Sequence, residues 1–285
     1  MRYTKSLVSF VDVLGFSSLV AEGGGSPERV GRILQLLRRG LDFNDDVENQ
    51  NFERKFVNFS DTCVRSIPLT PSHGRRNDWG ILFHEALEFV HVQLELVAYE
   101  LVFLRGGITM GDVCHEDGLA FGPALVRAHA LESHAARYPR IVLDPIVVGE
   151  FIKGNSLHSD TNTPEEETEF LLDLLAHDSD GAYFVDYLWA AKDECDEWDN
   201  YFKLLKEHHI AIKDGLRAAE KDVSLAVKFG WLARYHERTL DRLEKEEGVD
   251  ASCFRLNETS HSFFQTIPER TVEPPPRRRL PISTE

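Results

Sequence analysis

The sequence contains no run of about twenty consecutive apolar residues, the length that a helix needs to cross a bilayer. Its N-terminal apolar stretch is interrupted by Asp12 before it reaches the length of a secretory signal, so we expect a cytoplasmic protein with no membrane partner. Basic residues are also few: 32 Lys and Arg stand against 48 Asp and Glu, a formal net charge of −16. Nucleic-acid binding needs a clustered basic surface, and this balance argues against it.

Cysteine is scarce, and its spacing does not suggest a disulfide framework or a zinc site. The sequence has 4 cysteines and 12 histidines, and it contains no CxxC, HxxxH or HExxH pattern. The ordinary interpretation of the cysteines is therefore that of reduced structural thiols. They are Cys63, Cys114, Cys195 and Cys253.

The chain does have enough apolar residues for a sizeable core, at 42% of 285 residues, or about two domains at roughly 150 residues each. Short β-rich runs alternate with segments of helical periodicity. We expect strands over 7–13, 52–69 (a hairpin around Ser60 and Asp61), 101–122 (a second pair), 140–144 and 181–189, with helices over 28–42, 81–101 and 123–137. This order predicts an α+β fold in which a mixed sheet is flanked by helices.

The character of the sequence changes after about residue 150. Residues 159–180 are strongly acidic, and apolar residues recur at helical spacing over 191–247, which predicts two long helices. The C-terminus is rich in proline and arginine, as extended or disordered tails are. We therefore expect a sheet domain over 1–190, a helical extension over 191–262 and a disordered tail over 263–285.

Two aspartates interrupt β-rich apolar runs. Asp12 lies within Phe-Val-Asp-Val-Leu, and Asp61 lies within Phe-Ser-Asp-Thr-Cys. An ionised carboxylate in such surroundings needs a cation or strong donors, and hard oxygen ligands suit Mg²⁺ or Mn²⁺. Each aspartate taken alone could instead form a turn or pair with an arginine. Gly15, three residues after Asp12, could open a tight turn into a helix whose free N–H groups hold phosphate oxygens.

Four segments, in this order and at this spacing, resemble the class III nucleotidyl cyclases, the superfamily of adenylyl and guanylyl cyclases. They are FVDVLGFSSL (10–19), FSDT (59–62), LRGGITMG (104–111) and FGPALVRAHALESHA (121–135). The resemblance covers about residues 7–190 and implies the cyclase fold for this catalytic domain. It also implies that the ribose 3′-oxygen of a nucleoside triphosphate attacks the α-phosphorus and that pyrophosphate leaves.

The resemblance assigns roles to individual residues. Two Mg²⁺ or Mn²⁺ ions per active site would be bound by Asp12 and Asp61, with the main-chain carbonyl of Val13 as a further ligand. The turn at Gly15 would place the amides of Phe16 and Ser17 against the phosphates. Arg105 would bind the triphosphate. The family works as a head-to-tail homodimer with composite sites, so Arg127 or a neighbour would reach in from the second subunit.

The sequence departs from the family at the positions that select the base and stabilise the transition state. Val57 and Leu119 stand where adenylyl cyclases have their polar base selectors, and neither side chain can hydrogen-bond a purine. Val126 and Ala130 stand where the family has Asn and Arg, with Arg127 beside the first and His129 beside the second. The family's late lysine is also missing.

Within the superfamily, the chain most resembles the bacterial pyrimidine cyclases of the Pycsar anti-phage system. This implies UTP as substrate, CTP less so, and cyclic UMP as a product read by a separate effector with a cyclic-nucleotide-binding domain. Lys55 and Phe59 share strand parity with Val57 and Asp61, so either could line the base pocket.

Two alternatives remain. One is an atypical purine cyclase that selects its base through the backbone. The other is an inactive cyclase-like domain that senses nucleotides or binds a protein, which the missing Asn, Arg and Lys favour. A diguanylate cyclase is not expected, because its GGDEF or GGEEF hairpin is absent.

Overall fold

The computed structural model describes residues 2–16, 20, 26–28, 30–31, 34–35, 53–70 and 80–256. These residues form an eight-stranded sheet in the order β2-β3-β1-β4-β6-β8-β7, with β5 paired to β4. All pairings are antiparallel except that of β4 with β6. The strands are β1 (Thr4–Val13), β2 (Lys55–Phe59), β3 (Thr62–Pro68), β4 (Leu104–Glu116), β5 (Leu119–Phe121), β6 (Ile141–Leu143), β7 (Leu175–His177) and β8 (Tyr183–Val185).

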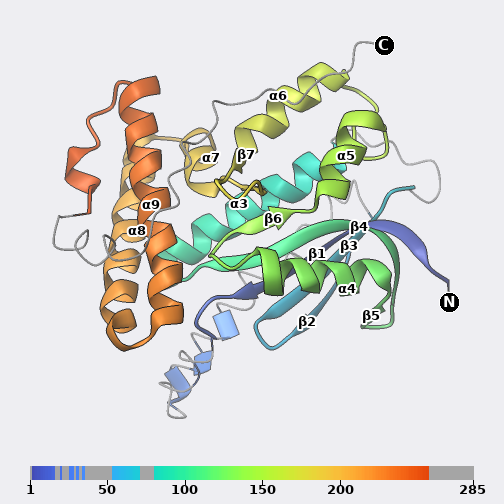
Figure 1. The fold of residues 1–285 in the computed structure, drawn as a ribbon, viewed down its shortest axis with the longest axis horizontal. Coiled ribbons are helices and arrows are strands. Elements are labelled where there is room, and N and C mark those ends of the chain that lie inside the picture. The colour runs from blue at the N-terminus through green and yellow to red at the C-terminus, as the bar shows by residue number, and fades with distance from the viewer. Residues whose placement is uncertain are drawn as a thin grey trace.

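Helices cover both faces of this sheet (Figure 1). Helix α3 (Ile81–Glu100) packs on one face, and α4 (Pro123–Ala130), continued by a π-helical turn, η2 (Leu131–Ala135), packs on the other. The other helical segments are α5 (Pro145–Lys153), α6 (Pro164–Leu174), α7 (Tyr187–Glu194), α8 (Trp198–Ala218), η3 (Ala219–Lys221), α9 (Val223–Glu246) and η4 (Ser252–Phe254). The predicted mixed sheet flanked by helices is confirmed.

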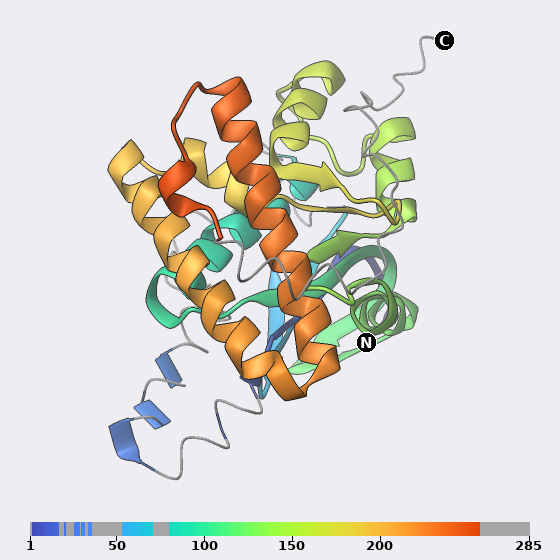
Figure 2. The same cartoon turned by 60° about the vertical axis from the view of Figure 1, so that its left-hand side comes forward.

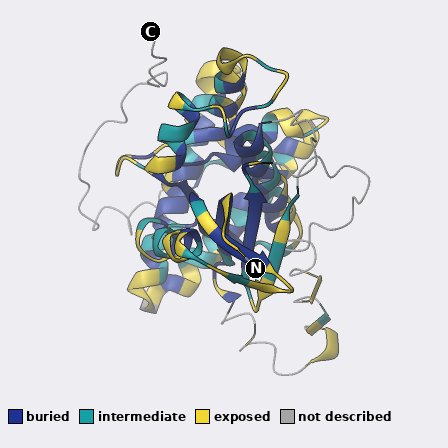
Figure 3. Cartoon of the chain, turned by 90° about the vertical axis from the view of Figure 1, so that its right-hand side faces the viewer, coloured by how far each residue is buried: buried dark blue, intermediate teal, exposed yellow. Residues whose placement is uncertain are grey.

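Strand β1 runs through the middle of the sheet and is buried on both faces (Figure 3). Leu7, Val11 and Val13 belong to the main core beneath α3. Val8 and Phe10 pack on the opposite face against α4. Because side chains alternate along a strand, Asp12 lies on the α4 face.

Helices α8 and α9 form a hairpin beside the sheet (Figure 2), as the sequence predicts. A buried chain of hydrogen bonds joins them. His236 Nε2 lies 2.9 Å from the carbonyl oxygen of Phe254, which can only accept, so the proton of neutral His236 is on Nε2. His236 Nδ1 therefore accepts from His208 Nδ1 at 3.0 Å, and His208 Nε2 accepts from the Tyr187 hydroxyl at 2.7 Å.

Several sequence expectations need correction. The strand expected over 181–189 ends at Val185, because Asp186 is followed by helix α7 rather than more strand. The helix expected over 123–137 ends at residue 135, and its last turn is π-helical. Helices α5 and α6 were not foreseen. The helix expected over 28–42 lies largely outside the described residues, and the tail from 257 onward lies wholly outside them.

The division into parts at residues 190 and 262 stays a prediction. Helix α7 crosses the first of these positions, and residues of α8 and α9 share the main hydrophobic core with the sheet. In the part of the chain that is described, no helix is long and apolar enough to cross a membrane.

Candidate active site

The candidate site is built around Asp12 at the end of β1. Asp12 lies between two neighbours in the sheet, opposite Thr62 on β3 and opposite Arg105 on β4. Its side chain is 16% exposed, so the carboxylate is mostly buried but reachable from solvent. The end of a central strand thus presents one acidic group to the α4 side of the sheet.

The β2–β3 hairpin brings Asp61 to the same end of the sheet. The tight turn needs a positive φ of 58° at Ser60, and Asp61 follows directly. The amide of Val13 donates to the main-chain oxygen of Asp61 at 3.3 Å, which ties the hairpin to the residue after Asp12. The structure therefore places the two aspartates together, close enough for the charge of Asp61 to act on Asp12.

Arg105 pairs with Asp12 directly. Its Nε lies 2.9 and 3.2 Å from the two carboxylate oxygens, and its Nη2 lies 2.9 Å from Oδ2. The sequence predicts a triphosphate-binding role for Arg105, which is untested. Here its guanidinium neutralises the carboxylate that was predicted to hold metal.

Glu132 is a further member of the cluster, and the sequence analysis did not identify it. Its Oε1 lies 2.6 Å from Arg105 Nη2, and its side chain is 5% exposed. A usable signal existed: Glu132 follows Ala124 and Ala128 at four-residue intervals, so it continues the buried face of the helix. The π-helical turn carries it, as such turns often do at functional sites.

Gly106 and Gly107 allow β4 to lie close to η2 and to β1. A Cβ atom on Gly107 would lie 2.5 Å from Leu131 Cβ, and one on Gly106 would lie 2.5 Å from the Phe10 carbonyl oxygen. Without side chains, β4 can lie close to η2 on one face and to β1 beside it. The two glycines after Arg105 thus permit the packing that brings Glu132 to it.

The electrostatics follow from this crowding. Burial raises the pKa of Asp12 above its usual value; the hydrogen bonds and charge of Arg105 oppose the rise, and the charges of Glu132 and Asp61 add to it. Burial alone would lower the pKa of Arg105, but Asp12 and then Glu132 raise it above its usual value. Arg105 is therefore a permanent cation among three acidic groups.

Arg127 lies elsewhere on the α4 face. It forms a two-pronged ion pair with Asp144, through Nε and through Nη2, the latter 2.7 Å from Oδ1. Asp144 also accepts a hydrogen bond from the Thr109 hydroxyl. Thr109 lies four residues beyond Arg105 on β4, so the two residues are about 13 Å apart along the strand at roughly 3.3 Å per residue. Within one chain, nothing described brings Arg127 to Asp12.

The predicted base-pocket residues are also spread out. Phe59 flanks the hairpin turn near Asp61 and is 82% exposed, and Val57 is half-buried in β2. Lys55 donates to the carbonyl oxygen of His115, near the far end of β4, and Leu119 on β5 is paired at that same end and 66% exposed. A single chain does not gather these residues into one pocket.

The predicted phosphate turn is described in part. Gly15 has the positive φ of 83° expected of a tight turn, and Phe16 is buried at the start of the following helical segment. The amide of Leu14 donates to the carbonyl oxygen of Phe103 at 2.8 Å, which fixes the chain just before the turn. Ser17 lies outside the described residues.

The residues present fit a divalent cation by their chemistry. Asp12 and Asp61 offer carboxylate oxygens, Val13 offers a main-chain carbonyl, and these hard ligands suit Mg²⁺ or Mn²⁺. Among the described residues, however, no three His, Cys, Asp or Glu side chains converge as a ready metal site. Arg105 stands where a cation would, between the carboxylates of Asp12 and Glu132.

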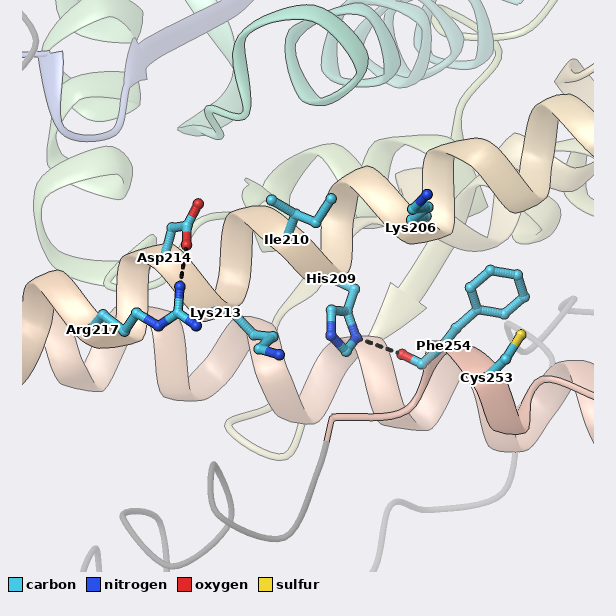
Figure 4. A pocket seen from close by; sticks show the side chains of 8 residues that line it. All are labelled: Lys206, His209, Ile210, Lys213, Asp214, Arg217, Cys253 and Phe254. Carbon is cyan, nitrogen blue, oxygen red and sulfur yellow. Dashed lines mark hydrogen bonds and ion pairs between the residues drawn. The ribbon is translucent and has the colours of Figure 1, made fainter.

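An open cavity of about 340 Å³ lies away from this cluster, on α8 and η4 (Figure 4). It contains none of the residues predicted to act on a nucleotide. Its lining residues are Lys206, His209, Ile210, Lys213, Asp214, Arg217, Cys253 and Phe254.

No family model and no curated protein matches the chain. Several solved structures are similar to the chain at low identity, and their names describe adenylyl or guanylyl cyclases or a cyclase-like protein. A class III adenylyl cyclase-like ATP-binding protein from Pseudomonas aeruginosa is 15% identical, with a TM-score of 0.37, over 59% of this chain and 40% of that one. The catalytic core of a rhodopsin-guanylyl cyclase with converted specificity, in complex with ATPαS, is 15% identical, with a TM-score of 0.36, over 65% of this chain and 97% of that one.

A bacterial light-regulated adenylyl cyclase is likewise 15% identical, with a TM-score of 0.32, over 50% of this chain and 77% of that one. The present chain thus spans only 40% of the length of the Pseudomonas protein.

Proposed function

We propose that the chain is a nucleotidyl cyclase that converts UTP to 3′,5′-cyclic UMP and pyrophosphate. The observation that carries this proposal is the meeting of Asp12, Asp61 and Arg105 at one end of the sheet, from three different strands or turns. Two carboxylates beside a strong cation are the groups that bind metal and a triphosphate. The positive-φ turn at Gly15 lies just beyond Asp12 in the chain.

In this proposal Asp12, Asp61 and the Val13 carbonyl hold two Mn²⁺ or Mg²⁺ ions. When bound, the ions would lower the pKa of the ribose 3′-hydroxyl and neutralise charge that develops on the phosphates. The amides of Phe16 and Ser17, after the turn at Gly15, orient the triphosphate. Arg105 binds its terminal oxygens and supports the departure of pyrophosphate.

The active unit would be a head-to-tail homodimer. Arg127, 56% exposed in its side chain, would contribute from the second subunit, and the base pocket would be completed across the interface by Lys55, Val57, Phe59 and Leu119. The support is that large apolar side chains lie open on these elements: Phe59, Leu119 and Val126 are 82%, 66% and 70% exposed. Leu119 and Val126 lie on β5 and α4, which contact each other, and exposed apolar side chains on neighbouring elements fit an interaction surface.

The pyrimidine preference rests on Val57 and Leu119, which cannot pair with a purine edge through their side chains. By its resemblance to the Pycsar cyclases, the product would be the signal for a separate effector with a cyclic-nucleotide-binding domain in anti-phage defence. CTP or a purine triphosphate is the alternative substrate.

A nucleotide panel tests the proposal. Purified protein with Mn²⁺ is incubated with UTP, CTP, ATP and GTP separately and then in equimolar mixture, and the products are identified by mass. We expect cyclic UMP to dominate the mixture. A purine cyclic product would contradict the base assignment, and no cyclic product from any triphosphate would favour the inactive, nucleotide-sensing alternative.

A further inference from the structure

Two carboxylates share one guanidinium in this structure. Arg105 Nη2 lies 2.9 Å from Asp12 Oδ2 and 2.6 Å from Glu132 Oε1. The contact with Asp12 has hydrogen-bond geometry and is doubled by Nε, whereas the contact with Glu132 is a charge contact only. The same nitrogen therefore serves two acids, and it is bound more fully by Asp12.

Glu132 has little else to balance its charge. It is 4% exposed, and its Oε1 accepts no hydrogen bond from any described residue. The other oxygen, Oε2, accepts only from the neighbouring hydroxyl of Ser133, at 2.8 Å. A buried carboxylate needs a counter-ion, and among the described residues Arg105 is the cation that pairs with Glu132, so Glu132 and Asp12 compete for one guanidinium.

The charges of the cluster also favour the binding of a divalent cation. With Arg105 paired to Glu132, the ionised carboxylates of Asp12 and Asp61 carry two negative charges. One divalent cation balances these two charges. It would bind at Asp12 and Asp61, at the open side of the cluster, because Glu132 is enclosed by η2.

We propose that Arg105 is a displaceable internal counter-ion of Asp12 and that Glu132 is the positioning residue that holds it. In the nucleotide-free protein the guanidinium closes the Asp12 site. When a divalent cation binds at Asp12, the guanidinium releases Asp12 and keeps its contact with Glu132, which holds it beside the site for the triphosphate. The inference rests on the metal site of the proposed function, and it adds a residue and a competition to that site.

The proposal predicts Mn²⁺ affinity in the absence of nucleotide. Arg105→Met removes the competing cation and should raise the affinity for Mn²⁺ about tenfold, since a charged hydrogen bond is worth about that much. Glu132→Gln should lower it several-fold, because Arg105 then stays on Asp12. The Mn²⁺ dissociation constant is measured by calorimetric titration of the full chain, with a spin-resonance signal of free Mn²⁺ as a second readout.

A double-mutant cycle separates this role from others. In the Arg105→Met background, Glu132→Gln should leave Mn²⁺ affinity unchanged, because Glu132 acts only through Arg105. An equal loss in both backgrounds would mean that Glu132 binds the metal itself or acts by charge alone, and would overturn the proposal. Asp112→Asn is the matched control: it removes one acid from an exposed position on the same strand and should change nothing.

The outcomes also distinguish this inference from the proposed function. If Arg105→Met does not tighten Mn²⁺ binding while the wild-type protein forms a cyclic product, the inference is wrong and the function stands. If Arg105→Met tightens Mn²⁺ binding but the wild-type protein cyclises no triphosphate, the inference stands and the proposed function is wrong. Absence of Mn²⁺ binding in both the wild type and Arg105→Met would overturn both.

Discussion

Asp12 and Arg105 face one another across neighbouring antiparallel strands, and the guanidinium of Arg105 donates to both oxygens of the Asp12 carboxylate. Charge-assisted, forked pairing of this kind is among the stronger polar contacts in proteins. It holds the ends of β1 and β4 in register beside the Asp61 turn. In the proposed function, this pair must open for Asp12 to bind a metal ion.

Replacing either aspartate should abolish turnover without unfolding the protein. Asp12→Asn and Asp61→Asn keep the side-chain shape but remove the charge that binds the metals, so we expect a loss of about a thousandfold or more in kcat with Mn²⁺. Steady-state product formation and circular dichroism are measured in parallel. Near-native turnover by either variant would rule out the two-metal assignment.

Gly107→Ala should separate η2 from β4. The added Cβ would lie 2.5 Å from Leu131 Cβ and 3.1 Å from the Ala128 carbonyl oxygen, so the helix must move. Overpacking of this kind costs about 1–3 kcal/mol of unfolding free energy. The matched control is Gly149→Ala in α5, where a Cβ meets nothing within 4 Å and helix propensity favours alanine. Urea unfolding measures both, and equal effects would contradict the packing described.

How far the sequence predicts this site depends on the kind of contact. The strand pattern around Asp12 and the hairpin at Ser60 are local signals, and they predict an aspartate within β1 and another at the turn. That β1 lies beside both β3 and β4, so that Asp12 meets Asp61 and Arg105, depends on which strands are neighbours, which periodicity does not reveal. The spacing of Glu132 from Ala128 predicts that it is buried, but it does not reveal that Arg105 is its partner.

Contacts with distant parts of the chain also explain the end of β8 and the partner of Arg127. The run 181–189 is apolar except for Asp186 and resembles one buried strand, but Asp186 accepts a hydrogen bond from the Tyr235 hydroxyl of α9, 2.7 Å away, and the chain turns into helix there. Arg127 is predicted to act from a second subunit; within the chain it pairs with a buried acid on another element, Asp144, and its catalytic role stays a prediction. Distant tertiary partners decide both cases.

The stability of the helical extension should fall in acid. Burial lowers the pKa of His236 from 6.5 to about 4, and burial together with the neighbouring histidines lowers the pKa of His208. The unfolded chain therefore binds more protons than the folded chain between about pH 6.5 and 4, so stability is full above pH 7 and is lost as the pH falls through this window. His236 alone accounts for about 3 kcal/mol at pH 4.

Urea unfolding at intervals from pH 7.5 to 4.5 measures this slope. His236→Gln should make the slope shallower, whereas His91→Gln, at a half-exposed position on α3, should leave it unchanged. A pH slope that is the same in wild type and His236→Gln would show that the buried histidine pair does not titrate as described.

Subunit mixing tests whether the active site is composite. Asp12→Asn and Arg127→Met should each be inactive alone, but in a mixed head-to-tail dimer one of the two sites receives neither change. An equimolar mixture allowed to exchange subunits should recover about a quarter of wild-type activity. No recovery, with exchange verified by native mass spectrometry, would place both residues in the same subunit's site or remove Arg127 from catalysis.

The most direct test of the central claim is the stoichiometry of the reaction with UTP. Wild-type protein with Mn²⁺ should form cyclic UMP and pyrophosphate in equal amounts, as measured by mass and by ³¹P resonance, and excess chelator should stop both. Formation of UMP, or of UDP and phosphate, or of no product while UTP binds, would contradict the account of Asp12, Asp61 and Arg105 as a cyclase centre.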